Sequence, residues 1–207
     1  MLNIIKKSAL ILFALLLVVG TTYFITDLNQ TSAEYAKPIV ANNTEKLDEN
    51  NNESNETEIV VYHGDLAFNY TTVQDITYDS DSIYEVSVTN TNSFEYKDIV
   101  FTLSEASVNN LFKGEDISTV KILETGGTLN NVEYLFEEGG VLKPGDTAIV
   151  YLKKYIGPIP EAQGAYVISG VYQGKFDMDK STKKLTPAAT EQEELSEVQW
   201  LSDLNLE

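Results

Sequence analysis

Apolar and polar residues alternate with a period of two along much of the chain beyond residue 57. The clearest run covers residues 83–90, where the apolar Tyr84, Val86 and Val88 alternate with polar residues. A period of two sends successive side chains to opposite faces, so this run predicts a half-buried β-strand. The turn-forming residues 90–93 follow, and a second alternating run at 96–103 predicts a strand that pairs with the first.

Shorter runs separated by turn residues extend the pattern to residue 176. Residues 143–146 (Lys-Pro-Gly-Asp) predict a turn, because Pro fixes φ and Gly tolerates a positive φ. Gly170 indicates a bulge, and residues 104–114 are ambiguous, with a helical turn around 108–112 as one interpretation. Further strands are predicted within residues 59–62, 65–73, 75–78, 117–123, 132–136, 147–155 and 165–176.

The number and spacing of these runs indicate the fold class. Seven to eight short strands without alternating helices are typical of two packed antiparallel sheets rather than of a parallel α/β sheet. We therefore expect an all-β, Ig-like β-sandwich over residues 58–180. An apolar N-terminal helix precedes it, and an acidic tail that is helical or disordered follows it at residues 181–207.

The first 33 residues resemble an export segment. Lys6 and Lys7 precede an apolar run, and the first acidic residue after that run is Asp27. This order of charges predicts that the N-terminus lies on the inner side of a membrane and the rest of the chain on its outer side. Two interpretations stay open. One is a signal peptide cleaved after Ala33, and the other is an uncleaved anchor over residues 8–25, a length at the threshold for spanning a bilayer.

Residues 34–57 predict a flexible acidic linker. They are rich in Asn and Glu, and between residues 41 and 56 Leu47 is the one large apolar residue. Such a segment buries too little apolar surface to offset the entropy cost of ordering it. It fits a tether that holds a domain away from a membrane or a wall.

Two stretches resemble a known family of modules. Residues 84–93 followed by 96–101 resemble the strand–turn–strand phrase of bacterial surface Ig-like domains, and residues 142–146 resemble their L-x-P-G-(D/E) turn. The likeness is to CARDB-type and FxLYD-type domains and spans roughly residues 83–152. It implies a sandwich fold and an extracytoplasmic setting, and it transfers no functional residue.

Composition narrows the range of functions. The formal net charge is −18 over 207 residues, and all 14 basic residues are Lys. This charge disfavours nucleic acid and anionic lipid surfaces as partners, and without Arg there is no planar fork to clamp a phosphate. The chain has no Cys, which excludes disulfides, a thiolate nucleophile and Cys-ligated zinc.

Few residues suggest catalysis or metal binding. His63 is the only His, and its position beside Gly64 at a strand end favours an ordinary surface residue over a general base. Asp79 and Asp81 lie in a predicted turn, where their oxygens suit Ca²⁺, although Asp is also a common turn residue. Calcium is the one cofactor that the sequence suggests.

Aromatic residues suggest binding instead. The chain has 12 Tyr, of which Tyr166 and Tyr172 lie in the last predicted strand, where they could contact a partner. Residues 191–204 place Leu or Val at every third position and include the only Trp, Trp200, followed by Leu201. This spacing predicts a short amphipathic helix that docks on its own domain or in a partner's groove.

Together these observations predict a non-enzymatic module of the cell envelope, secreted or membrane-anchored at the cell surface. The module would bind an envelope protein or a glycan, or assemble with copies of itself, and would not bind nucleic acid. The N-terminal segment would contact the membrane if it stays uncleaved. The alternative is a hydrolase that uses two carboxylates on a sandwich scaffold.

Overall fold

The computed structural model describes residues 58–137 and 139–206, so the predicted export segment and linker lie outside the described residues. The described part is mostly β, as expected, and none of its helices is long and apolar enough to cross a membrane. Its helical segments are α2 (Val73–Asp79), η1 (Pro160–Ala162), α3 (Glu193–Ser196) and η2 (Leu201–Leu204). Its strands are β1 (Glu58–Tyr62), β2 (Ser82–Tyr96), β3 (Ile99–Lys113), β4 (Thr119–Thr125), β5 (Gly127–Leu129), β6 (Val132–Phe136), β7 (Thr147–Lys154), β8 (Tyr166–Ile168), β9 (Lys175–Met178) and β10 (Leu185–Pro187).

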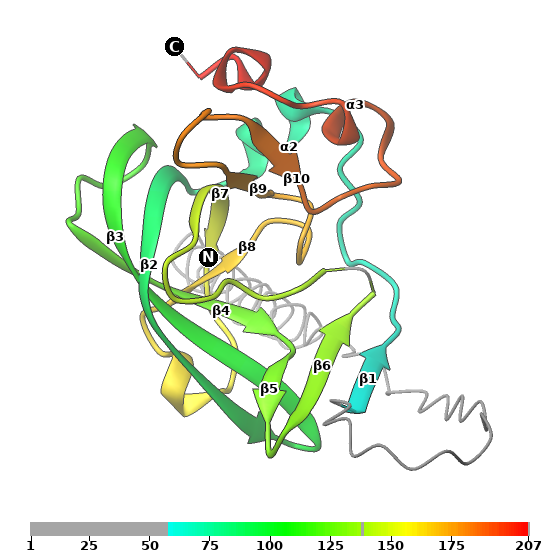
Figure 1. Cartoon of the computed structure of the whole chain (residues 1–207). Helices are drawn as coiled ribbons and strands as arrows, with labels where there is room; N and C mark the ends of the chain where they lie inside the picture. The colour runs from blue at the N-terminus through cyan, green and yellow to red at the C-terminus, as the bar shows by residue number, and fades with distance from the viewer. Residues whose placement is uncertain (1–57, 138, 207) are drawn as a thin grey trace, which may run out of the picture. The chain divides into compact units, whose positions relative to one another are not determined.

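Seven strands form one sheet that closes on itself (Figure 1). The order is β10-β9-β7-β2-β3-β4-β8, and β8 also pairs with β7. The ring β7-β2-β3-β4-β8 is therefore a closed five-stranded barrel. The prediction of two packed sheets is wrong, because the three-residue strand β8 pairs parallel with β4 and antiparallel with β7 and so closes one sheet into a barrel. Periodicity marks which residues lie in strands, but it does not show that the sheet closes.

The other three strands form a small sheet in the order β1-β6-β5. β1 pairs parallel with β6, although 70 residues or more separate their paired positions. The sheet is fixed to the barrel by Tyr62, whose hydroxyl accepts a hydrogen bond from the Val100 N–H at 3.1 Å. Tyr62 also stacks on Tyr134 with ring centroids 5.8 Å apart.

Strands β2 and β3 form one long hairpin of 15 residues on each side. The turn is at Lys97 and Asp98, whose φ angles of 51° and 64° suit a tight hairpin turn. The predicted turn at residues 90–93 is wrong, because these residues pair in β2 just after a register irregularity between Val88 and Asn90. The helical interpretation of residues 108–112 is also wrong, since β3 continues through them.

Three other segments differ from the sequence prediction. The strand predicted at residues 65–73 is absent, because residues 63–72 are irregular and Val73 begins helix α2. Residues 75–78 belong to helix α2 and not to a strand, because the Thr72 hydroxyl caps the Asp75 N–H at 3.1 Å. The predicted last strand is divided into β8 and β9 by a turn at residues 169–174. Gly170 has a φ of 65° in that turn, so it lies between two strands and does not form a bulge within one.

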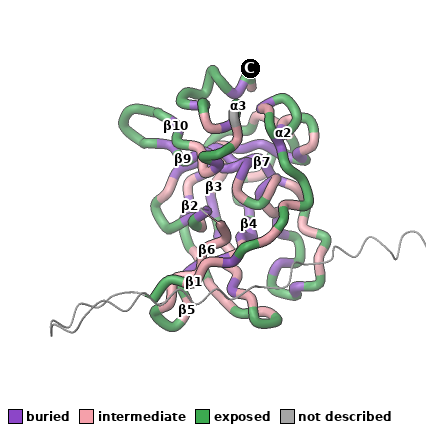
Figure 2. Tube along the Cα trace, turned by 90° about the vertical axis from the view of Figure 1, so that its right-hand side faces the viewer, coloured by how far each residue is buried: buried purple, intermediate pink, exposed green. Residues whose placement is uncertain are grey.

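The core is divided by the barrel wall. In β7, Ala148, Val150 and Leu152 face the barrel interior, while Ile149 and Tyr151 face a second cluster outside it. Figure 2 shows the buried residues gathered along the inner strands and the exposed ones at the loops. The second cluster includes residues from α2 and from the chain beyond residue 180: Val73, Ile76, Leu185, Leu195, Val198 and Leu204.

The C-terminal tail is therefore part of the folded unit. The predicted single helix is two short segments, α3 and η2. Leu195, Val198 and Leu204 are buried against the barrel wall, whereas Leu201, from the same predicted stripe, is 39% exposed. Docking on its own domain is the arrangement found, and the folded unit extends past the predicted boundary at residue 180.

Candidate functional site

The outer face of the barrel carries a cluster of half-buried aromatic residues that we call the aromatic shelf: Phe94, Tyr96, Phe101 and Tyr155. The sheet register explains its origin. In β3, Ala106 faces the barrel interior, so the odd-numbered Phe101 and Leu103 face outward. Phe94 of β2 lies directly opposite Phe101, and their ring centroids are 6.2 Å apart.

The loop between β7 and β8 forms one border of the shelf. Residues 155–165 pack through buried Ile159, Ala162 and Ala165 against this same cluster. The loop is held in shape by its own contacts, since the Tyr155 hydroxyl accepts from the Ile159 N–H at 2.8 Å. Gln163 donates to the carbonyls of Gly157 and Ile159 at 3.1 Å each. The shelf therefore lies between an ordered loop and the tip of the β2–β3 hairpin.

Polar groups line the other borders of the shelf. The Lys97 ammonium lies 5.3 Å from the centre of the Tyr96 ring. Asn92 is exposed opposite Leu103 on the same face, and Glu105 pairs with Lys121 at 3.5 Å across β3 and β4. Apolar rings with amide, ammonium and carboxylate groups at their edge can stack on a ring-shaped ligand and hydrogen-bond to its substituents.

A second candidate region lies on the inner side of β4, at a gap in the barrel wall. Pairing between β4 and β8 covers only Ile122 and Leu123. Beyond it, Glu124 forms an ion pair with Lys175 of β9, with Nζ and Oε1 3.0 Å apart. Their side chains are 5% and 4% exposed. We call this buried pair the seam, because side chains join the two strands where no backbone pairing does.

The seam is satisfied by hydrogen bonds. The Leu142 N–H donates to Glu124 Oε2 at 3.0 Å, and the Lys175 ammonium also donates to the carbonyl of Gly140. Burial raises the pKa of Glu124, and Lys175 and the Leu142 N–H oppose that rise. A small cavity of about 10 Å³ adjoins the pair, which is room for a single water. It is lined by Glu124, Thr125, Phe136, Gly139, Gly140, Val141, Val171, Tyr172 and Lys175.

The predicted calcium residues are held by separate partners. Asp79 pairs with Lys153 at 2.8 Å and accepts from the Tyr70 hydroxyl, and the Lys153 hydrogen bond holds the pKa of Asp79 below its usual range. Asp81 accepts from the Lys154 N–H at 2.8 Å. Within residues 58–137 and 139–206, no group of three His, Cys, Asp or Glu is placed to hold a metal. The calcium hypothesis stays a prediction.

The residues predicted to bind a partner are not brought together. Tyr166 is 8% exposed in the barrel-interior cluster, so it offers no surface to a partner. Tyr172 lines the cavity beside the seam, with its ring 6.5 Å from that of Phe136. Trp200 and Leu201 are 47% and 39% exposed at the start of η2.

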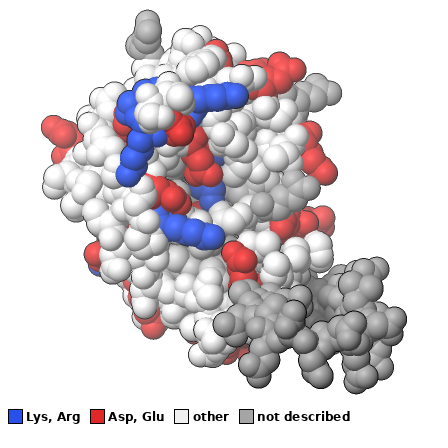
Figure 3. Space-filling model, viewed as in Figure 1, with Lys and Arg blue, Asp and Glu red and all other residues white. Residues whose placement is uncertain are grey.

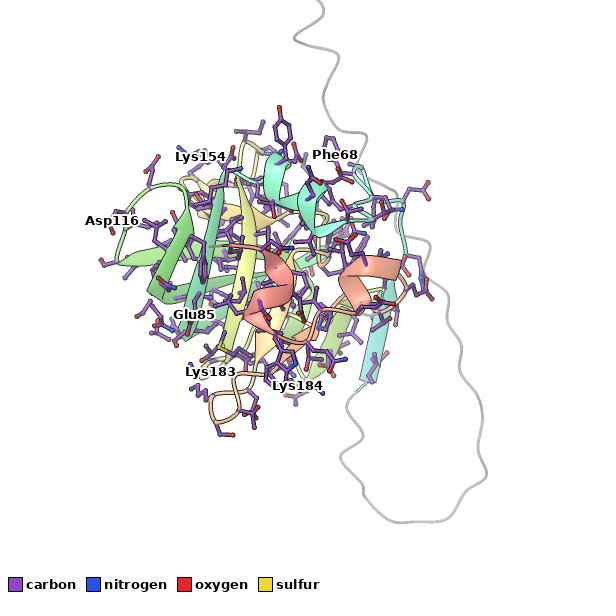
Figure 4. The ribbon with its side chains drawn as sticks, turned by 90° about the horizontal axis from the view of Figure 1, so that it is seen from above. Phe68, Glu85, Asp116, Lys154, Lys183 and Lys184 are labelled. Carbon is purple, nitrogen blue, oxygen red and sulfur yellow. The ribbon has the colours of Figure 1, made fainter. Side chains whose placement is uncertain are left out.

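His63 has an ordinary structural role. The His63 ring lies 3.0 Å from Glu137, which also accepts from the Gly64 N–H, so His63 joins the end of β1 to the end of β6. On the face of the molecule shown in Figure 3, Lys side chains gather in the upper part with acidic side chains among them. In Figure 4, Lys183 lies near Glu85, and the two form an ion pair at 3.7 Å.

Sequence reasoning missed both regions. Phe101 lies in a predicted strand, but Phe94 lies between that strand and the turn predicted at residues 90–93, and the face that the two rings share depends on where the hairpin turns. Glu124 and Lys175 are 51 residues apart, and nothing in the local pattern connects them. A buried charge inside an apolar strand, as in Lys-Ile-Leu-Glu-Thr at 121–125, was the one available signal.

Comparisons of the chain with protein-family models, with curated proteins and with solved structures each returned no match.

Proposed function

We propose that this protein is a non-enzymatic module of the cell envelope that binds a glycan on the aromatic shelf. The observation that carries the proposal is the set of half-buried rings of Phe94, Tyr96, Phe101 and Tyr155 on the outer face of the barrel. Sugars present flat C–H faces that pack on aromatic rings, and their hydroxyls need hydrogen-bond partners at the edge. The shelf offers both kinds of contact.

The order in which the barrel strands are connected also supports this face as the binding face. Numbered within the barrel, the strands follow the order 1-2-3-5-4, with strands 3 and 5 parallel and the other neighbours antiparallel. This resembles the five-stranded Greek-key barrel of OB-folds, which bind oligosaccharides or oligonucleotides on the face of strands 2 and 3 and on the 1–2 and 4–5 loops. The shelf occupies the corresponding face. This support is an analogy of topology.

Charge selects between these two ligand classes. A net charge of −18 without any Arg repels a polyphosphate chain and supplies few groups to neutralise it. A neutral glycan suffers no such repulsion. The export segment predicted at residues 1–33 would bring the module to where envelope glycans are accessible, and an uncleaved anchor with its linker would hold it there.

The hydrolase alternative gains no support from the seam. Glu124 is the carboxylate with the clearest burial, but a lysine and a backbone N–H already occupy its oxygens. A glycosidase needs a second carboxyl group across a space that admits a sugar ring. The adjoining cavity admits one water.

The experiment is co-sedimentation of the purified full-length chain with insoluble wall glycan, alongside titration with N-acetylglucosamine oligosaccharides. We compare the native chain with Phe101→Ala and with the control Phe68→Ala. Phe68 is 58% exposed and lies beside α2 in Figure 4, outside the shelf. The native chain and Phe68→Ala should bind, and Phe101→Ala should lose at least about fivefold in affinity, as stacking contacts contribute roughly 1–3 kcal/mol.

Two outcomes would contradict the proposal. One is no binding of the native chain to either material. The other is an equal loss of binding in Phe101→Ala and Phe68→Ala, which would indicate a non-specific apolar contact. Thermal unfolding of each variant, followed by circular dichroism, separates lost binding from lost folding.

A further inference from the structure

Residues 139–142 lead from β6 toward β7, and Glu124 and Lys175 hold them by their backbone. We call these residues the strap. The Gly140 carbonyl accepts from the Lys175 ammonium, and the Leu142 N–H donates to Glu124 at 3.0 Å. The strap is therefore attached to both members of the seam.

The strap also closes the barrel core. The Leu142 side chain is 1% exposed and belongs to the barrel-interior cluster with Tyr84, Val86 and Leu152. The strap begins at Gly139, which is buried against Tyr172 and donates its N–H to the Phe136 carbonyl at 2.9 Å, whereas the space around the next residue, Gly140, is open. Gly139 thus fixes one end of the strap to the end of β6, and beyond Gly139 the strap is held by the Leu142 side chain and by two contacts with a buried ion pair.

Such an arrangement is sensitive to the loss of either charge. A buried ion pair contributes little net stability while it is intact, but removing one partner leaves the other as an uncompensated buried charge. Lys175 would then lose its carboxylate, or Glu124 its ammonium, and each could regain water only if the strap moved. Segments with few apolar contacts open locally at lower free energy than the whole fold.

We propose that the strap is a hinged cover that the Glu124–Lys175 pair holds closed, and that it opens as one local unit. Opening withdraws Leu142 from the barrel core and joins the small cavity lined by Phe136 and Tyr172 to the barrel interior. The inference concerns the inner side of β4 and stands whether or not the shelf binds a glycan.

The test is native-state hydrogen exchange of the full-length chain at increasing low concentrations of denaturant. In the native chain, amides of residues 139–142 should exchange through an opening that depends less on denaturant than that of the β2–β7 amides. Lys175→Met should speed exchange in the strap at least about tenfold and change exchange in β2 and β7 less. The control Lys121→Met, which breaks the exposed pair with Glu105, should leave the strap unchanged.

Equal denaturant dependence of the strap and of the β2–β7 amides in the native chain would overturn the inference. So would unchanged strap exchange in a folded Lys175→Met variant. The native-chain comparison decides the question even where the variant fails to fold, because it needs no substitution.

Discussion

Strand β4 separates two surfaces that use neighbouring residues in opposite ways. Leu123 packs outward under the aromatic shelf, and Glu124 turns inward to Lys175. The shelf leaves apolar rings half exposed, while the seam buries two charges. Neither choice maximises stability, because exposed apolar surface and desolvated charge both cost free energy. The contrast teaches that substitutions on the aromatic shelf should mainly change binding, whereas substitutions in the seam should mainly change stability.

The largest expected effect comes from breaking the seam. Glu124→Ala should lower the free energy of unfolding by about 3–5 kcal/mol, because it leaves the Lys175 ammonium buried without a partner. Glu105→Ala, in the exposed pair with Lys121 on the same sheet, should cost less than about 1 kcal/mol. Chemical denaturation measures both, and equal effects would remove the distinction between the two ion pairs.

A smaller stability effect is expected on the shelf. Phe94→Ala removes a half-buried ring that packs on Phe101, so we expect a loss of about 1–2 kcal/mol, below the roughly 3–5 kcal/mol typical of a fully buried Phe. Its affinity for glycan should nevertheless fall as far as that of Phe101→Ala. A Phe94→Ala variant that unfolds more readily than Glu124→Ala would show that the shelf is core rather than surface.

Helix α2 belongs to neither surface, and a substitution at its N-terminus should have a still smaller effect on stability. Thr72→Ala removes the hydroxyl that caps the Asp75 N–H and should cost about 1 kcal/mol. Glycan binding should stay at the native level. A marked loss of binding in this variant would mean that binding follows overall stability and not the shelf.

The pH dependence of stability offers the finest comparison, since two carboxyl groups should act with opposite sign. Burial raises the pKa of Glu124, so its contribution is fully present below the ordinary pKa of Glu and is lost as the pH rises through the raised value. The Lys153 hydrogen bond lowers the pKa of Asp79, so its contribution is present above the ordinary pKa of Asp and is lost as the pH falls through the lowered value.

Chemical denaturation of Glu124→Gln and Asp79→Asn across pH 3 to 8 measures how each carboxyl group contributes to the free energy of unfolding. Glu124→Gln should remove a decline in stability on the alkaline side of about pH 4.3, and Asp79→Asn should remove a decline on the acid side of about pH 3.9. Profiles that match the native chain in both variants would contradict the assigned pKa directions.

The sequence predicted the parts of the fold that depend on local pattern. Alternation located strands at residues 83–90, 96–103 and 147–155, and the Lys-Pro-Gly-Asp turn is present, with the Asp146 N–H donating to the Lys143 carbonyl at 3.0 Å. Helix α2 was missed because Ile76 and Tyr78 also fit a period of two, although Thr72 followed by Asp75 resembles a helix-capping pair. Local pattern could have corrected that prediction.

The remaining features depend on contacts between distant residues. Barrel closure depends on β8, which is three residues long and pairs with both β4 and β7. The shelf depends on the hairpin turning at Lys97 and Asp98 rather than at residues 90–93. The seam joins positions 124 and 175, whose proximity follows from the pairing of β9 with β7. No single-sequence pattern encodes such pairings, which appear only in the three-dimensional arrangement of the strands.

The most direct test of the central claim is a map of backbone amide chemical shifts in the isotope-labelled full-length chain, recorded as an N-acetylglucosamine oligosaccharide is added. The account predicts saturable changes confined to the tip of the β2–β3 hairpin, to Leu103 and its neighbours in β3, and to residues 155–165. The chemical shifts of amides in α2 and in the tail around Trp200 should not change. Saturable changes centred on α2 or on Trp200, with the shelf unaffected, would contradict the account.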